Sequence, residues 1–263
     1  MGDSKQFRNG PQFDAWLGMT PRQSFAWPGG QGERPERDGP EIVDTLWEEG
    51  CAVTIDRMTQ STPEPASPAD VLRLWLGAHP LDAAAMQRVQ AQWFQKDEAF
   101  DALLRARFGA TLAAARAGRL DGWAQDADSW LALLIVLDQF SRNVFRGQPD
   151  SFAADAQALA LALAGIERGF DQAVPPMARI FAYLPLEHAE DAALQARSVA
   201  LFTALRDAPG AEPQAFFDGT LDYAHKHQDV IARFGRFPHR NAILGRASSA
   251  DELAYLAQPG AGF

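Results

Sequence analysis

Residues 130–140 read WLALLIVLDQF and decide the fold. The side chains are apolar on every side of a helix as far as Leu137, where Asp138 and Gln139 interrupt the run. A helix that is apolar all round is buried at the centre of a helical bundle. The run is also far shorter than the roughly 20 residues that a helix needs to cross a membrane. We therefore expect a central core helix and no membrane span.

Apolar residues before and after this stretch recur at helical spacing. One stripe, with a cap at Asp97 and an end at Gly118, consists of Phe100, Leu103, Leu104, Phe108 and Leu112. A second, which we expect Asp150 to open and Gly169 to close, consists of Phe152, Ala156, Leu159, Leu163 and Ile166. A third, on a helix expected to begin at Pro185, consists of Leu194, Ser198, Leu201 and Leu205. A fourth, starting at Pro213, consists of Phe216, Thr220, Tyr223, His227, Val230 and Phe234.

The pattern predicts an all-α fold, because no stretch shows the alternating, turn-bounded pattern of strands. We expect one domain of about eight to ten helices over residues 69–263. Residues 58–68 form a proline-rich lead-in to it. Residues 1–57 scatter glycine and proline among charges without a hydrophobic period, so they are expected to be a poorly structured extension. We hypothesise that translation starts at Met58 and that the extension is a start-site artefact.

The charge of the chain narrows the classes of partner. The 34 acidic and 24 basic side chains give a net charge of −10, which disfavours nucleic acid and anionic membrane surfaces as partners. The one cysteine, Cys51, excludes a disulfide within the chain. No signal peptide pattern is present, so we expect a cytoplasmic protein.

Three polar runs adjoin apolar helices and carry the candidate site residues. The first contains Asp138, Gln139, Arg142, Asn143 and Arg146. The second contains His188, Glu190 and Asp191, after Glu187. The third contains His227, Arg236, His239, Arg240 and Asn241. Asp138 follows the core helix and is expected to be shielded from water, with Arg142 four residues on in the favourable order for a helical ion pair.

The third run is a cationic patch in an acidic protein. Four arginines and no carboxylate lie between Asp229 and Asp251. Two kinds of partner could neutralise these arginines. The carboxylates of the second run pair with these arginines inside the fold, or a small anion binds among Arg142, Arg236, His239 and Arg240 through guanidinium contacts.

Diagnostic catalytic and metal motifs are missing from the sequence. There is no G-x-S-x-G, Walker loop or G-x-G-x-x-G, so a serine hydrolase elbow, a P-loop and a dinucleotide fold have no support. The histidine and carboxylate spacings match no HExxH or paired CxxC pattern. We therefore assign no metal ligand, and the sequence identifies no cofactor.

The three runs, read as motifs, resemble the bacterial domain-of-unknown-function family 924. The motifs are LLIVLDQFSRNVFRG at 133–147, YLPLEHAED at 183–191 and RFGRFPHRN at 233–241. The resemblance implies an all-helical fold similar to right-handed tetratricopeptide-like arrays, and it implies no established activity. This chain departs from the pattern at Ser141, Glu187 and Ala189, and the second departure weakens any essential role for Glu187. The family's signature polar residues correspond here to Asp138, Gln139, Arg142, Asn143, Arg146, His188, Glu190, Asp191, His227, Arg236, His239, Arg240 and Asn241.

These observations lead to a functional hypothesis. We expect the three runs to meet in a pocket that binds a small anionic ligand. His188 and His239 are the candidate general acids or bases, with Asp191 or Glu190 as the candidate orienting carboxylate. Two alternatives stay open: a peptide-binding scaffold in which the polar runs are structural clasps, and a metal-dependent hydrolase. The sequence leaves open whether the protein is an enzyme, and it points to no protein partner.

Overall fold

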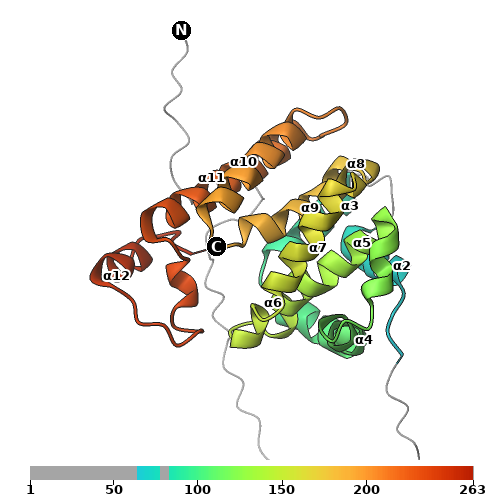
Figure 1. Cartoon of the computed structure of the whole chain (residues 1–263), viewed down its shortest axis with the longest axis horizontal. Coiled ribbons are helices and arrows are strands. Elements are labelled where there is room, and N and C mark those ends of the chain that lie inside the picture. Colours follow the sequence, from blue (N-terminus) through green and yellow to red (C-terminus); the bar gives the residue numbers. More distant parts are fainter. Residues whose placement is uncertain (1–63, 78–82, 263) are drawn as a thin grey trace, which may run out of the picture.

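The computed structural model describes residues 64–77 and 83–262 (Figure 1). All regular structure in this part of the chain is helical, which confirms the predicted all-α fold. The α-helices are α2 (Pro68–Leu76), α3 (Ala83–Phe94), α4 (Glu98–Arg116), α5 (Ala127–Leu134), α6 (Ser141–Val144), α7 (Asp155–Glu167), α8 (Phe170–Ala173), α9 (Pro176–Glu187), α10 (Ala192–Arg206), α11 (Gln214–Phe234) and α12 (Ala250–Leu256). Shorter 3₁₀ turns are η1 (Asp121–Gln125), η3 (Pro149–Ser151) and η4 (Pro238–Arg240). The expected extension at 1–57 and residues 58–63 of the lead-in lie outside the described residues.

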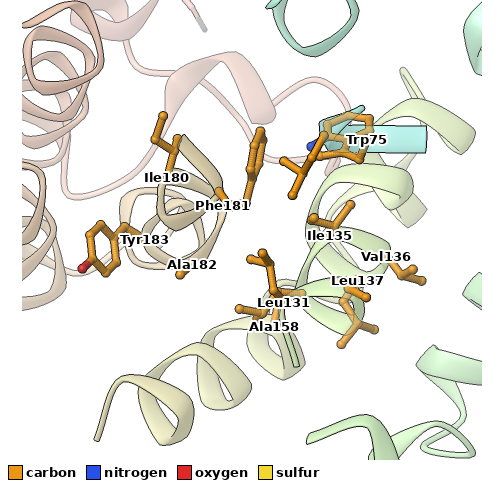
Figure 2. Packing of buried hydrophobic residues seen from close by; sticks show 14 of the residues in the cluster. Trp75, Leu131, Ile135, Val136, Leu137, Ala158, Ile180, Phe181, Ala182 and Tyr183 are labelled. Atoms are coloured by element: carbon orange, nitrogen blue, oxygen red, sulfur yellow. The ribbon is translucent and has the colours of Figure 1, made fainter. Parts of the chain in front are cut away.

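Residues 130–140 form the buried centre of the molecule, as predicted. They fold as α5 followed by η2 (Ile135–Phe140), and every one of their side chains is buried. Helices α2, α4, α7 and α9 pack around them. The ring of Trp75 meets Phe140 and Phe181 edge-on, with centroids 5.6 and 5.7 Å apart. Figure 2 shows Trp75 and Phe181 closing over Ile135 between α2, α9 and the central helix.

The central helix changes register before it reaches its polar end. Residues Ile135–Phe140 form a π-helical turn, and α6 then continues in the same direction. A π turn holds an extra residue compared with an α turn, so it rotates the residues after it about the helix axis. The sequence predicted a regular helix here. The difference matters because Asp138 lies within this turn.

Helix α7 begins later than the sequence predicted, and the centre of its buried face is shifted by one position. Asp150 lies in the η3 turn, and the helix begins at Asp155. Its fully buried residues are Ala158, Ala162 and Gly165. Leu159, Leu163 and Ile166 of the predicted stripe are partly buried against the same core, and Ala156 is exposed. Small residues are required because a side chain at Gly165 would meet the indole of Trp130 on the core helix.

Pro185 does not begin the third predicted helix. It lies inside the last turns of α9, and α10 begins only after Asp191, whose side chain caps it by accepting a hydrogen bond from the Leu194 N–H at 2.9 Å. The second polar run therefore ends one helix and caps the next. Its three carboxylates do not share a first helical turn.

Helix α11 follows the prediction more closely. It extends over Gln214–Phe234 and pairs with α10 along its length. Phe216, His227 and Val230 of the predicted inner line are buried. The chain then turns at Gly235, whose φ of 70° suits glycine, and leads through η4 to α12. Figure 1 shows α12 at one end of the α10 and α11 pair, away from α4 and α5.

The described helices contain no apolar stretch that is long enough to cross a bilayer. The right-handed tetratricopeptide-like arrangement stays a prediction.

Candidate functional site

Side chains from all three polar runs surround a cavity of about 480 Å³. The first run contributes residues from the end of the core helix, the second from the end of α9, and the third from α11 and η4. The polar lining includes Gln139, Arg142, Asn143, Arg146, Glu187, His188, His227, His239 and Arg240. Aromatic side chains complete the wall: Trp93, Phe94, Phe152, Phe202, Phe216 and Tyr223. Segments about 100 positions apart in the sequence thus share one cavity.

Asp138 lies beneath the cavity floor and holds His188. Its side chain is 2% exposed, and its Oδ1 lies 2.8 Å from Nδ1 of His188 and 3.0 Å from Nη1 of Arg142. Gln139 donates to Oδ2 at 2.6 Å. Burial disfavours the charged carboxylate, but Arg142 and His188 outweigh burial and hold the pKa of Asp138 well below its usual value.

His188 is a neutral imidazole at neutral pH. Burial and the charge of Arg142 lower its pKa, and Asp138 offsets them only in part. A neutral ring that bonds a carboxylate through Nδ1 carries its proton there, which leaves a lone pair on Nε2. Nε2 makes no hydrogen bond to the described residues, and the ring lines the cavity. This nitrogen can accept a proton from a molecule in the cavity.

A second histidine lies beside the first. The rings of His227 and His188 have centroids 6.3 Å apart. Nδ1 of His227 lies 2.9 Å from the Tyr223 carbonyl and 3.0 Å from Oε1 of Glu187. Burial lowers the pKa of His227 well below its usual value. Burial, together with the charge of Asp138, raises the pKa of Glu187 to about 8. At neutral pH, Glu187 and His227 are therefore an uncharged pair.

Two arginines that line the cavity share one carboxylate. Arg142 binds Asp155 through two hydrogen bonds of 3.0 and 3.1 Å. Arg240 reaches the same carboxylate through one contact of 3.4 Å. Asp155 was not among the residues expected from the sequence. It begins α7, where an acidic residue is an ordinary helix-start signal, so only its tertiary contacts reveal it.

Arg240 is a buried cation with few anionic contacts. Its side chain is 8% exposed, and its guanidinium lies 4.8 Å from the ring centre of Phe152 and 4.5 Å from that of Phe237. Its Nε is buried and has no hydrogen-bond partner among the described residues. Burial, and then the charge of Arg142, lower the pKa of Arg240 to about 10. Asp138 and Asp155 balance the charges of Arg142 and Arg240 in number, but the guanidinium of Arg240 has only one long contact with a carboxylate.

Arg146 and Asn143 line the cavity but are anchored elsewhere. Both bond Asp101 of α4, Arg146 at 2.7 and 2.9 Å and Asn143 at 2.8 Å. Asp101 is a second carboxylate that sequence reasoning missed, because it lies on a helix with no polar run.

Besides Asp138, four of the expected site residues lie outside the cavity wall. Glu190 accepts hydrogen bonds from the Phe237 N–H and from Arg246, at 2.7 to 2.9 Å. Arg236 binds Glu252 at 2.7 and 2.9 Å. Asn241 contacts Ser248 and Arg246. Asp191 caps α10 and is exposed. The contacts of Glu190, Arg236 and Asn241 tie the segment after α11 to the rest of the fold. The carboxylate that contacts His188 is that of Asp138, and neither Asp191 nor Glu190 orients this ring.

Across residues 64–77 and 83–262, no group of three or more His, Cys, Asp or Glu side chains is arranged to hold a metal ion.

The chain is similar to one protein family in sequence and to a solved structure in fold. A model of a family described as a bacterial protein of unknown function, DUF924, matches residues 71–260. The solved structure of a protein of unknown function from Agrobacterium tumefaciens is 41% identical to this chain, with a TM-score of 0.62. The match covers 72% of this chain and 96% of that one. No curated protein matches.

Proposed function

Since this chain belongs to the DUF924 family of bacterial proteins, whose function is unknown, we propose its function from the cavity: the protein binds a small anionic ligand there. The observation that carries the proposal is Arg240. A guanidinium that is almost fully buried needs charged or hydrogen-bonding partners. Its one carboxylate contact is long and is shared with Arg142. A carboxylate or phosphate oxygen in the cavity would supply the missing contact.

A thermal-shift screen against phosphorylated and carboxylated metabolites tests this proposal. A ligand that binds only the folded state stabilises it by about 2.7 kcal/mol at a hundredfold excess over its Kd. Arg240→Gln should abolish the shift, and Arg233→Gln should retain it because Arg233 is exposed. A shift that survives in Arg240→Gln would remove Arg240 from the site, and the absence of any shift across the screen would contradict the proposal.

The Asp138 and His188 pair favours acid–base chemistry as a second candidate function. The carboxylate orients the ring and stabilises the imidazolium that forms when Nε2 takes a proton. Nitrogen-15 spectra at neutral pH should find His188 protonated on Nδ1 and unprotonated on Nε2. On an activated ester or phosphate that the protein turns over, His188→Gln should lower kcat by about a hundredfold or more. His225→Gln, at an exposed position, is the matched control. A His188 ring protonated on Nε2 would contradict the role.

The two remaining alternatives receive less support. The clasp contacts of Glu190 and Arg236 fit a structural role for those residues, but they leave the cavity unexplained. The metal-dependent hydrolase has no ligand cluster to support it in the described chain. The proposal includes a cytoplasmic location, neither nucleic acid nor membrane as a partner, and no assigned cofactor or protein partner.

A further inference from the structure

We infer that the ligand is an elongated amphipathic anion, with a carboxylate or phosphate head at Arg240 and an apolar body that follows α11 toward Trp93. This inference rests on the proposed function and specifies the class of ligand. It starts from the wall that α11 provides. Phe216, Thr220, Tyr223 and His227 all line the cavity. At 1.5 Å per residue, the wall from Phe216 to His227 is about 16 Å long.

The two ends of this wall differ in chemistry. At the first end, the rings of Trp93, Phe94 and Phe216 contact one another, with centroids 6.1 to 6.5 Å apart. Trp93 and Phe216 are buried, and Phe94 is 46% exposed. Aromatic rings at such distances form a surface that binds apolar groups. This end suits an alkyl chain or an aromatic ring.

At the second end, the wall meets the buried charges. The ring of His227 lies 5.5 Å from that of Phe237, and Arg240 packs on the Phe237 ring at 4.5 Å. The guanidinium of Arg240, which has one long carboxylate contact and an unpartnered Nε among the described residues, is therefore near the His227 end of the wall. The anionic head of the ligand belongs here.

Three further cations line the cavity and do not compete for the head. Arg142 is held by Asp138 and Asp155, each at 3.0 Å. The side chains of Lys96 and Arg146 are 63% and 38% exposed, so they lie at the rim. Each already contacts a carboxylate: Lys96 contacts Glu98 at 3.1 Å, and Arg146 is held by Asp101. Exposed, paired cations bind anions weakly compared with a buried one.

The size of the cavity agrees with an extended ligand. Its volume of about 480 Å³ lies within the range of about 300 to 1,000 Å³ for pockets that bind small organic molecules. A bare phosphate or acetate would leave the aromatic end unfilled.

Isothermal titration of the whole protein with a chain-length series tests the inference. The probes are acetate, hexanoate, octanoate and octyl phosphate, with hexan-1-ol as the uncharged control. Each buried methylene should tighten Kd by about fourfold, which corresponds to about 0.8 kcal/mol. Octanoate should therefore bind about tenfold to fifteenfold tighter than hexanoate. Hexan-1-ol should bind at least about tenfold weaker than hexanoate, because it cannot neutralise Arg240. Comparing octanoate with octyl phosphate identifies the preferred head.

Two variants locate the apolar body. Phe94→Ala should reduce the gain from hexanoate to octanoate and leave acetate unchanged. Leu253→Ala is the matched control, because Leu253 is 58% exposed and lies outside the cavity wall. Thr220→Trp should fill the middle of the wall and abolish the chain-length dependence. Phe94 is a surface residue, so its variant keeps the test decisive if Thr220→Trp fails to fold.

The outcomes separate this inference from the proposed function. Anion binding with no chain-length dependence, or equal binding of hexan-1-ol and hexanoate, would overturn the inference. In the first case the proposed function would stand. If no anion binds in this series or in the metabolite screen, the proposed function fails as well.

Discussion

At the scale of single residues, Asp138 connects Gln139, Arg142 and His188. The sequence predicted that Asp138 would be shielded from water and paired with Arg142. The side chain is buried, and the ion pair is present. Its bond to His188, 50 positions along the chain, could not be predicted from spacing. The sequence offered Glu190 and Asp191 as partners of that histidine because they are its neighbours in the chain. The fold instead uses them to cap a helix and to hold the last segment.

Asp138→Asn should destabilise the protein by about 3 kcal/mol at pH 7, because it leaves Arg142 buried with one fewer anion. Asp138 has a lowered pKa in the folded state, so its contribution is complete above the ordinary value of 3.8 and is lost as the pH falls further. The difference between the variant and the native protein should therefore shrink below about pH 4. Urea unfolding at several pH values measures it, with Asp229→Asn at an exposed position as the control. A loss below about 1 kcal/mol at pH 7 would contradict the network role.

Glu187 gives the opposite pH dependence. Its pKa is raised from 4.5 to about 8, so its contribution is complete below pH 4.5 and is lost as the pH rises toward 8. The buried histidines His188 and His227 have lowered pKa values, and their effect on stability is flat above their usual value of 6.5. Between pH 6.5 and 8, the free energy of unfolding should fall by up to about 1.4 kcal/mol per pH unit. Glu187→Gln should remove this slope. An unchanged slope in the variant would show that Glu187 ionises normally.

Glu187 received less weight in the sequence-based hypothesis, because it departs from the family pattern at that position. The structure explains why the chain tolerates it. A protonated carboxyl group beside a neutral histidine carries no net charge, so it can be buried at a modest cost. Only the neighbouring charges and the depth of burial, which sequence does not contain, distinguish this state from an exposed glutamate.

At the scale of elements, the helices could be predicted well and their ends and faces less well. The stripes of α4 and α11 follow the predicted spacing, except that Leu103 of α4 is 39% exposed. Asp97 caps the start of α4 as predicted. In α7 the chain buries small residues, because Trp130 of the core helix needs the space. Hydrophobic periodicity favours large residues as the inner face, so it placed the centre of that face one position late, on leucine and isoleucine side chains that are only partly buried against the core. The π turn at Ile135–Phe140 likewise leaves no signal in an apolar sequence.

Gly165→Ala tests the contact between α7 and the core helix. The added methyl group would overlap Trp130, so the free energy of unfolding should fall by about 1 to 3 kcal/mol. Gly109→Ala is the matched control, because Gly109 also lies within a helix and a methyl group there meets no other atom within 4 Å. That variant should be stabilised by about 0.5 to 1 kcal/mol. Equal effects of the two substitutions, measured by urea unfolding, would contradict the packing role.

At the scale of the whole molecule, three motifs that are distant in sequence predicted one shared site, and they do share a cavity. Buried charges need partners, so polar runs beside apolar helices are expected to meet. The polar pattern alone does not distinguish residues that line the cavity from residues that hold the chain. Arg240 and Arg246 lie six positions apart, yet one faces the cavity and the other clasps Glu190.

Glu190→Gln should loosen the segment after α11 without unfolding the core. The ion pair with Arg246 and the bond to the Phe237 N–H fix this segment against the end of α9. Hydrogen exchange of residues 236–256 should become faster, while exchange in α5 and α7 stays the same. Glu167→Gln, an exposed site on α7, is the control. Uniform acceleration over the whole chain would instead indicate a global loss of stability.

The carboxylate of Asp155 is held from two sides, by Arg142 early in the chain and by Arg240 late in it. A ribosome that has produced the first of these segments has not yet made the second. A nascent chain can therefore collapse its core around residues 130–140 while the cavity still lacks the wall that His239 and Arg240 provide. Any ligand would meet a complete cavity only after that last wall has been synthesised and has docked.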